Sequence, residues 1–170
     1  MSTPRLEAPG IVLRPLEIAD ASSLFAAHSD PEAHHYWSEP AHANVEETAR
    51  EIERTLTLPG ALVWAITVDG GEALGRLLLW TPREGVGEFG IILRREAQGR
   101  GLAAKALKLV KAYGFGEMGL HRLAADIDPD NSASISLFLR AGFQREGLLR
   151  GNWKTHIGVR DSVIMAKVKI

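Results

Sequence analysis

A short glycine-containing string, Gln98 to Ala103, holds the residues of this chain best suited to bind an anion. Apolar and β-branched residues before it, from Val86 to Leu93, predict a strand, and apolar residues at helical spacing after it predict a helix. Backbone N–H groups at the start of that helix lack helical partners and can hold a phosphate. Gly99 and Gly101 allow a close approach of backbone to ligand, although a plain tight turn also uses such glycines.

A second motif begins at Asn131, with Ser134 one helical turn later and the string Arg140-Ala141-Gly142-Phe143 after it. The two strings resemble the acetyl-CoA loop and the Asn-x-x-Ser helix of the GNAT superfamily of N-acetyltransferases. Within it, they are most similar to the ribosomal-protein N-terminal acetyltransferase (Rim-type) branch. The stretch between the motifs suits one helix and one strand, and the resemblance runs from about Ile11 to the C-terminus.

This resemblance implies an enzyme that moves an acetyl group from acetyl-CoA to a primary amine by direct transfer in a ternary complex. The implied acceptor is a protein N-terminal amine; a small amine such as a polyamine, an amino acid or an aminoglycoside is the alternative. A noncatalytic acyl-CoA-binding module is a further alternative. A dinucleotide-binding module is disfavoured, because no third glycine follows Gly99-Arg100-Gly101.

The family pattern assigns acetyl-CoA to three groups of residues. Backbone N–H groups of the glycine loop hold the pyrophosphate, and Arg100 adds charge. The strand before the loop pairs with the pantetheine arm, and the amide of Ile92 faces the acetyl oxygen. Asn131 bonds the arm or an ordered water. The expected cofactor-binding residues are Ile91, Ile92, Leu93, Gln98, Gly99, Arg100, Gly101, Leu102, Ala103, Asn131 and Ser134.

Acetyl transfer needs a group that accepts the amine proton, and Glu88 is the candidate general base. It lies on the expected strand, ten residues before Gln98, close to where many family members place a catalytic glutamate. Strand alternation puts Glu88 on the face opposite Phe89 unless a bulge at Gly90 changes the register. A solvated strand glutamate is the alternative interpretation.

The leaving thiolate can take a proton from a nearby hydroxyl, and here the chain departs from a common family pattern. Many relatives carry a tyrosine seven residues after the helix asparagine, whereas this chain has Phe138. The Rim-type branch points to Ser134 as the proton donor instead. A serine that only contacts the cofactor, or that bonds its own helix backbone, is the alternative.

Aromatic residues beside a carboxylate suit an amine acceptor, through cation–π and charge contacts. The segment with Tyr36, Trp37 and Glu39 borders the acceptor cleft in this family, and the loop with His156 forms the opposite wall. These four residues are the expected substrate-binding residues. The two aromatic residues can equally cover the edge of the core.

Composition limits the other classes. The net charge of −1 over 170 residues gives no general attraction to nucleic acid or to anionic membranes, and no apolar run is long enough to span a bilayer. The lack of cysteine and of a signal peptide favours a cytoplasmic protein, as monomer or homodimer. Six histidines include no helical i, i+4 pair, so the sequence predicts no metal site.

The order of expected elements is β-α-α-β-β-β-α-β-α-β-β, within one domain spanning residues 1–170. Asp20 and Asn44 are the residues expected to cap the first two helices. The last two expected strands run from Phe143 to Leu149 and from Asp161 to Val168. Hairpins followed by strand–helix–strand units predict an α/β fold with a mixed sheet and helices on both faces. The resemblance sharpens this to the GNAT fold, whose seven-stranded, mostly antiparallel sheet splays apart between its fourth and fifth strands. In that fold the pantetheine arm enters the gap.

Overall fold

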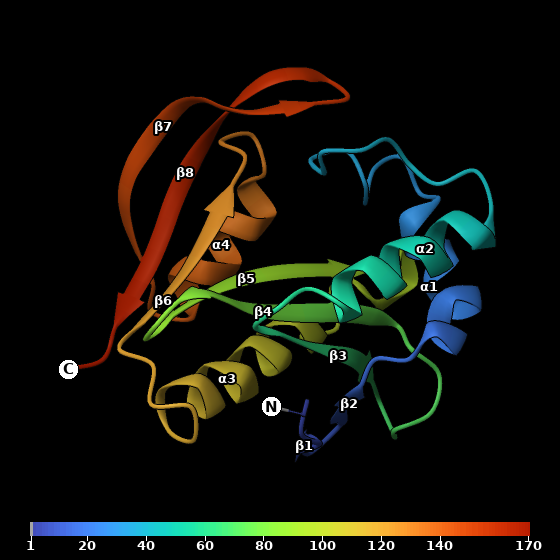
Figure 1. Cartoon of the computed structure of the whole chain (residues 1–170), viewed down its shortest axis with the longest axis horizontal. Coiled ribbons are helices and arrows are strands. Elements are labelled where there is room, and N and C mark those ends of the chain that lie inside the picture. Colours follow the sequence, from blue (N-terminus) through green and yellow to red (C-terminus); the bar gives the residue numbers. More distant parts are fainter. Residues whose placement is uncertain (1) are drawn as a thin grey trace.

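The computed structural model describes residues 2–170, which build one eight-stranded sheet flanked by four α-helices (Figure 1). The strand order across the sheet is β1-β2-β3-β4-β5-β6-β8-β7, and every neighbouring pair is antiparallel except β5 and β6. The strands are β1 (Leu6–Ala8), β2 (Ile11–Pro15), β3 (Ala61–Thr67), β4 (Gly75–Arg83), β5 (Val86–Leu93), β6 (Arg122–Ile127), β7 (Gln144–Thr155) and β8 (Gly158–Val168).

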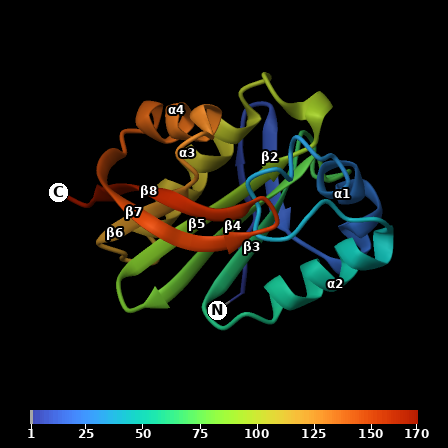
Figure 2. The ribbon, with the colours of Figure 1, turned by 90° about the horizontal axis from the view of Figure 1, so that it is seen from above.

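The helices lie on both faces of the sheet, α1 and α2 on one side and α3 and α4 on the other (Figure 2). They are α1 (Ala21–His28), α2 (Val45–Leu56), α3 (Leu102–Phe115) and α4 (Ser132–Arg140), with short 3₁₀ turns at Ile18–Asp20 and Arg95–Ala97. None of the helices within residues 2–170 has the length and apolar character needed to cross a membrane.

The period-2 alternation of strand side chains divides the core into two parts. On β3, Leu62, Trp64 and Ile66 pack with α3 and α4, whereas Val63 and Ala65 pack with α1 and α2. All five side chains are buried. The apolar run of β3 is therefore explained by helices that cover both of its faces.

The parallel pairing of β5 with β6 is short, and the gap that opens where it ends determines the position of the candidate site. Only Val86, Gly87 and Glu88 pair with β6, and β6 then runs steeply away from β5 (Figure 1). The splay predicted between the fourth and fifth strands is confirmed; these strands are β5 and β6 here, because the sheet has one strand more than expected. The additional strand is β1, a three-residue segment paired with β2.

The bulge considered at Gly90 is absent, and one strand is longer than expected. β5 pairs with β4 in unbroken register from Glu88 to Leu93, and the irregularity falls between Trp80 and Arg83 instead of at Gly90. The last hairpin is longer than predicted, since β7 runs to Thr155 and includes residues expected in a loop. Gly87 reflects close packing: an added Cβ would come within 2.7 Å of the Leu79 side chain.

Both expected helix starts are present, but only one of the two expected capping residues forms a capping hydrogen bond. Asn44 caps α2 by accepting a hydrogen bond from the Glu47 amide at 3.0 Å, as the sequence predicted. Asp20 precedes α1 but makes no capping bond to it. Its carboxylate instead accepts two hydrogen bonds from Arg14, at 2.9 and 2.7 Å, and so ties α1 to β2.

Arg76 is a buried cation on β4, on the face covered by α1 and α2. Its guanidinium donates to Glu51 at 3.1 Å and to the Thr55 hydroxyl at 3.0 Å, both on α2. It also lies over the ring of Trp37, 5.3 Å from the centroid. The pair with Glu51 therefore connects the sheet, α2 and the loop that carries Trp37.

Replacing Glu51 with alanine leaves this buried guanidinium without its carboxylate. We expect the free energy of unfolding to fall by about 3 kcal/mol, because an uncompensated buried charge is costly. Urea denaturation measures the change. Glu53→Ala, at an exposed position of the same helix, is the control and should change the value by no more than about 0.5 kcal/mol. Equal losses in the two variants would contradict the role assigned to the pair.

Candidate active site

A cavity of about 700 Å³ lies at the splay, between the end of β5 and the N-termini of α3 and α4. It is lined by ten of the eleven residues expected to bind the cofactor. The exception is Arg100, whose side chain is exposed and which does not line this cavity. The sequence analysis missed Arg140, Asp30 and Arg95, which also line it. Arg95 and Asp30 form an ion pair at 2.8 Å, which lowers the pKa of the Asp30 carboxyl.

The glycine loop has the geometry of an anion cradle. Gly99 and Gly101 both have left-handed backbone angles, with φ of 74° and 75°. A Cβ added to either would meet no atom within 4 Å, so both face open space. The first i, i+4 bond of α3 runs from the Lys105 amide to the Gly101 carbonyl, which leaves the N–H groups of residues 102–104 without helical acceptors. These residues line the cavity.

A second cavity, of about 380 Å³, opens between β5, β6 and the β7–β8 hairpin. Glu88 lines it, on the strand face shared with its partner Trp80. Within residues 2–170 the Glu88 carboxylate makes no hydrogen bond or ion pair; Arg122, whose guanidinium donates to Glu146 at 2.9 Å, acts on it only through its charge. A half-buried carboxylate without a fixed partner in a cavity is available to a ligand.

The two cavities meet. Five residues line both of them: Tyr36, Trp37, Ile91, Asn131 and Ser134. Ile91 comes from β5 beyond the last residue paired with β6, and the others come from the α1–α2 loop and the start of α4. A molecule in one cavity can therefore touch a molecule in the other at this border.

Hydrogen bonds fix the polar groups at the border. The Asn131 side chain accepts from the Ser134 amide at 3.2 Å and so caps α4, which gives its oxygen a structural function that the sequence analysis did not assign. The Tyr36 hydroxyl donates to the Asp130 carbonyl at 3.1 Å. Phe138 is buried and packs against Phe143, with ring centroids 5.0 Å apart.

The other two expected substrate-binding residues lie outside the linings of both cavities. Glu39 is exposed, and its carbonyl accepts from His34 at 3.0 Å. His156 stands at the tip of the β7–β8 hairpin, where its amide donates to the Ser38 carbonyl at 2.9 Å. Its Nε2 lies 3.0 Å from the His35 carbonyl. His156 thus joins the hairpin to the α1–α2 loop, which approach each other in Figure 1.

Carboxylates outnumber cations in the lining of the second cavity, and only Glu88 among them was expected from the sequence. Besides Glu88, the lining includes Asp126, Asp128 and Asp161, against one guanidinium, Arg160. Arg160 donates to Asp128 at 2.7 and 2.9 Å, which lowers the pKa of that carboxyl. Asp126 accepts from the Trp153 indole at 2.7 Å. The acids come from β6, β8 and the segment after β6, which no sequence motif brings together.

Comparison with known proteins agrees with this architecture. Residues 11–144 match the family model described as an acetyltransferase (GNAT) domain. The chain is 33% identical to the uncharacterized N-acetyltransferase p20 of Bacillus licheniformis, over 82% of each chain. It is 29% identical to the spermidine N(1)-acetyltransferase of Escherichia coli K12, over 93% of this chain and 86% of that one.

One solved structure illustrates the fold. Mycobacterium smegmatis RimJ in complex with CoA-disulfide superposes with a TM-score of 0.81 at 23% identity, over 97% of this chain and 86% of that one. The likeness to RimJ is one of fold. The matched domain and the relatives together establish that the chain belongs to the GNAT family of N-acetyltransferases, with acetyl-CoA as cosubstrate.

Proposed function

We propose that the chain transfers the acetyl group directly from acetyl-CoA to a primary amine while both are bound. The observation that carries this proposal is the shared border of the two cavities, where Ile91, Asn131 and Ser134 face both. Acetyl-CoA supplies an activated acetyl group as a thioester. No covalent acetyl-enzyme is needed when the amine can reach the thioester across that border.

The larger cavity has the features that coenzyme A requires. Three free N–H groups and the positive end of the α3 dipole favour the pyrophosphate at Gly99 and Gly101. Within residues 2–170, the edge of β5 from Phe89 to Leu93 has no strand partner on the β6 side. This edge offers backbone groups to the amides of the pantetheine arm. We assign the oxygen of the acetyl group to the amide of Ile92 by the family pattern. Arg140, on the cavity wall, is a further cation for the phosphates.

Glu88 is our candidate for the group that accepts the amine proton. An ammonium cannot attack a carbonyl, so the acceptor must lose a proton as the N–C bond forms and the C–S bond breaks. Glu88 lines the second cavity, and its carboxylate has no hydrogen-bonding partner within residues 2–170. It can take the proton directly or through one water.

Ser134 is our candidate proton donor to the departing thiolate. Its side chain lines both cavities, and Phe138, at the position where many relatives carry tyrosine, has no proton to give. Its position also fits a simple cofactor contact. The two functions differ in what substitution changes, kcat in one case and coenzyme A affinity in the other.

For the acceptor we favour an amine with more than one positive charge, such as a polyamine. Four carboxylates against one guanidinium give the second cavity a negative potential. Trp80 and Trp153 add aromatic surface to the same wall. The spermidine acetyltransferase among the relatives is consistent with this choice.

A protein N-terminal amine is the second candidate. β7 is the outer strand of the sheet, and nearly all of its residues are exposed beside the second cavity. An extended peptide can pair with such an edge and place its terminus in a neighbouring pocket. The likeness in fold to RimJ is compatible with this use.

An acceptor screen separates these candidates and tests turnover itself. Acetyl-CoA is incubated with the full chain and with polyamines, peptides, amino acids or aminoglycosides, and free thiol is recorded. We expect the highest kcat/KM with polyamines and a fall of that value as salt screens the carboxylates. A preference for peptides would select the second candidate. Coenzyme A binding without thiol release on any amine would indicate a noncatalytic binding module.

Gly101→Ala tests the phosphate cradle. The added Cβ projects into the open space of the larger cavity, so we expect coenzyme A to lose most of its thermal stabilisation of the protein, worth about 2.7 kcal/mol at one hundred times Kd. Gly119→Ala is a matched control: its φ is 65° and its Cβ also meets nothing within 4 Å, but it lies outside the cavity lining. Equal coenzyme A shifts in both variants would contradict the assignment.

Glu88→Gln keeps the shape of the side chain but cannot take a proton. Loss of a general base costs about 10²–10⁴ in kcat, so turnover should fall by that factor while coenzyme A binding is retained. The residual rate should rise with pH as the acceptor deprotonates itself. Glu84→Gln, on the exposed turn between β4 and β5, should behave as wild type. An unchanged kcat in Glu88→Gln at neutral pH would show that Glu88 is not the general base and is only a solvated residue of the strand.

Ser134→Ala distinguishes a proton donor to the thiolate from a residue that only contacts coenzyme A. If Ser134 protonates the thiolate, kcat should drop with little change in coenzyme A affinity. Ser132→Ala and Ser136→Ala should be nearly silent, since neither residue lines a cavity. Weaker coenzyme A binding by about 0.5–1.5 kcal/mol with kcat unchanged would make Ser134 a binding residue only.

A further inference from the structure

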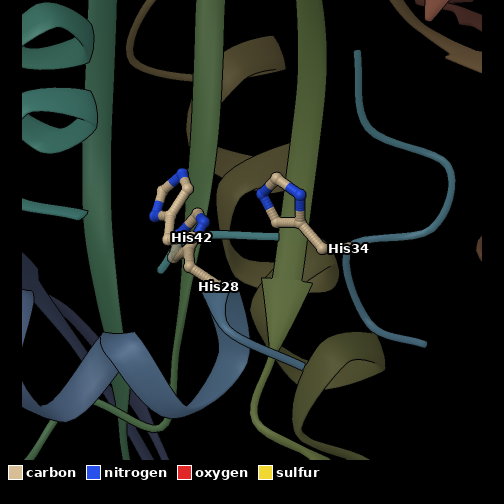
Figure 3. Close-up of side chains that lie close together, drawn as sticks. All are labelled: His28, His34 and His42. Carbon is tan, nitrogen blue, oxygen red and sulfur yellow. The ribbon is translucent and has the colours of Figure 1, made fainter. Parts of the chain in front are cut away.

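Three histidines that are apart in the sequence meet next to Trp37, which lines the second cavity, the candidate acceptor cavity. His28 is the last residue of α1, and His34 and His42 lie in the loop between α1 and α2 (Figure 3). One nitrogen from each ring lies within 4.8 Å of the other two. His28 is 0% exposed, His34 is 3% exposed, and His42 is half-buried.

The sequence predicted no metal site because no two histidines stand at i, i+4 on one helix. The fold nevertheless gathers three of the histidines that are separate in the sequence. A helix end and a loop bring them together, and the His42 amide donates to the His28 carbonyl at 2.8 Å to hold the loop against α1.

The hydrogen bonds leave a free nitrogen on each ring. Neither nitrogen of His28 has a partner among the described residues, which is unusual for a buried polar group. Nδ1 of His34 lies 3.0 Å from the Glu39 carbonyl and must donate its proton to it, so Nε2 carries a lone pair. Nδ1 of His42 lies 2.8 Å from the Thr48 hydroxyl. Contacts of this kind orient metal-ligating histidines.

One buried charge lies close to the cluster. Arg76 lies over the ring of Trp37, on which His34 stacks, and its guanidinium is paired with Glu51 at 3.1 Å.

We propose that His28, His34 and His42 form a binding site for a first-row divalent metal ion, with Zn²⁺ the best match. Three neutral imidazoles are a donor set that Zn²⁺ takes in proteins, with a water or small anion as fourth ligand. Zn–N bonds near 2.05 Å place tetrahedral nitrogens about 3.3 Å apart, so the three nitrogens must close in from their present separations. The rings of His28 and His42 are stacked at 6° with centroids 4.8 Å apart, and this stack must open by side-chain rotation.

The position of the site gives the ion a structural effect on the acceptor cavity. His34 stacks on Trp37 at 19°, with centroids 5.6 Å apart, and Trp37 lines both cavities. An ion held by one ligand from α1 and two from the loop fixes the loop segment that presents Tyr36 and Trp37. The metal thus orders a cavity wall and takes no part in acetyl transfer.

Metal titration of the full chain, first treated with a chelator, tests the site without any activity measurement. Co²⁺ should give the visible absorption of a tetrahedral complex at one ion per chain, and Zn²⁺ should abolish it by displacement. Zn²⁺ at one hundred times Kd should raise Tm by about 5–10 °C. His28→Asn and His42→Ala should lose both signals; His42, being half-buried, is the variant less prone to unfold, and circular dichroism confirms folding.

His35→Ala is the matched control, since His35 lies in the same loop and is exposed. It should keep both signals. The proposal is overturned if the folded wild type shows no Co²⁺ absorption and no rise in Tm. It is also overturned if folded His42→Ala binds as wild type does, or if His35→Ala loses the absorption. None of these outcomes depends on the acceptor or on Glu88, so the site stands or falls separately from the proposed reaction.

Discussion

The site depends on one backbone constraint, the brief parallel pairing of β5 with β6. Three residues of β5 pair with β6, and beyond Glu88 the strands diverge. Backbone N–H and C=O groups along the rest of that edge need partners, and no strand in residues 2–170 supplies them there. A ligand that carries amide groups can. The same divergence opens both cavities, one on the α3 and α4 side and one beside the hairpin.

Two segments far apart in the sequence then form the walls. The α1–α2 loop carries Tyr36 and Trp37, and the β7–β8 hairpin lies opposite. The hairpin touches the loop through the His156 amide and the Ser38 carbonyl. The buried guanidinium of Arg76 on β4 contacts the loop by lying over the ring of Trp37. Contacts of Trp37 with Arg76 and with His34 thus connect the sheet to a loop that has no helix or strand of its own.

Sequence reasoning located the features that local chemistry dictates. The glycine loop and the helix after it were predictable because the backbone there selects particular residue types, whereas Asn131 was identified from the family resemblance and its capping bond to α4 was not predicted. β1 was missed because three residues carry no readable period. The strand before the last turn was predicted to end at Leu149, because Gly151 and the polar residues after Leu149 interrupt its apolar alternation. Asp126 and Asp161 come together only by pairing across the sheet, and the histidines only by folding of the loop, so no spacing along the chain could reveal them.

The central claim is direct transfer between two bound substrates, and initial velocities test it without any variant. Acetyl-CoA and the best acceptor are varied together, and reciprocal rates are plotted against reciprocal concentrations. The shared border of the cavities predicts lines that intersect, because both substrates must be bound before chemistry begins. Parallel lines, together with release of coenzyme A in the absence of acceptor, are the signature of a covalent acetyl-enzyme and would contradict the account.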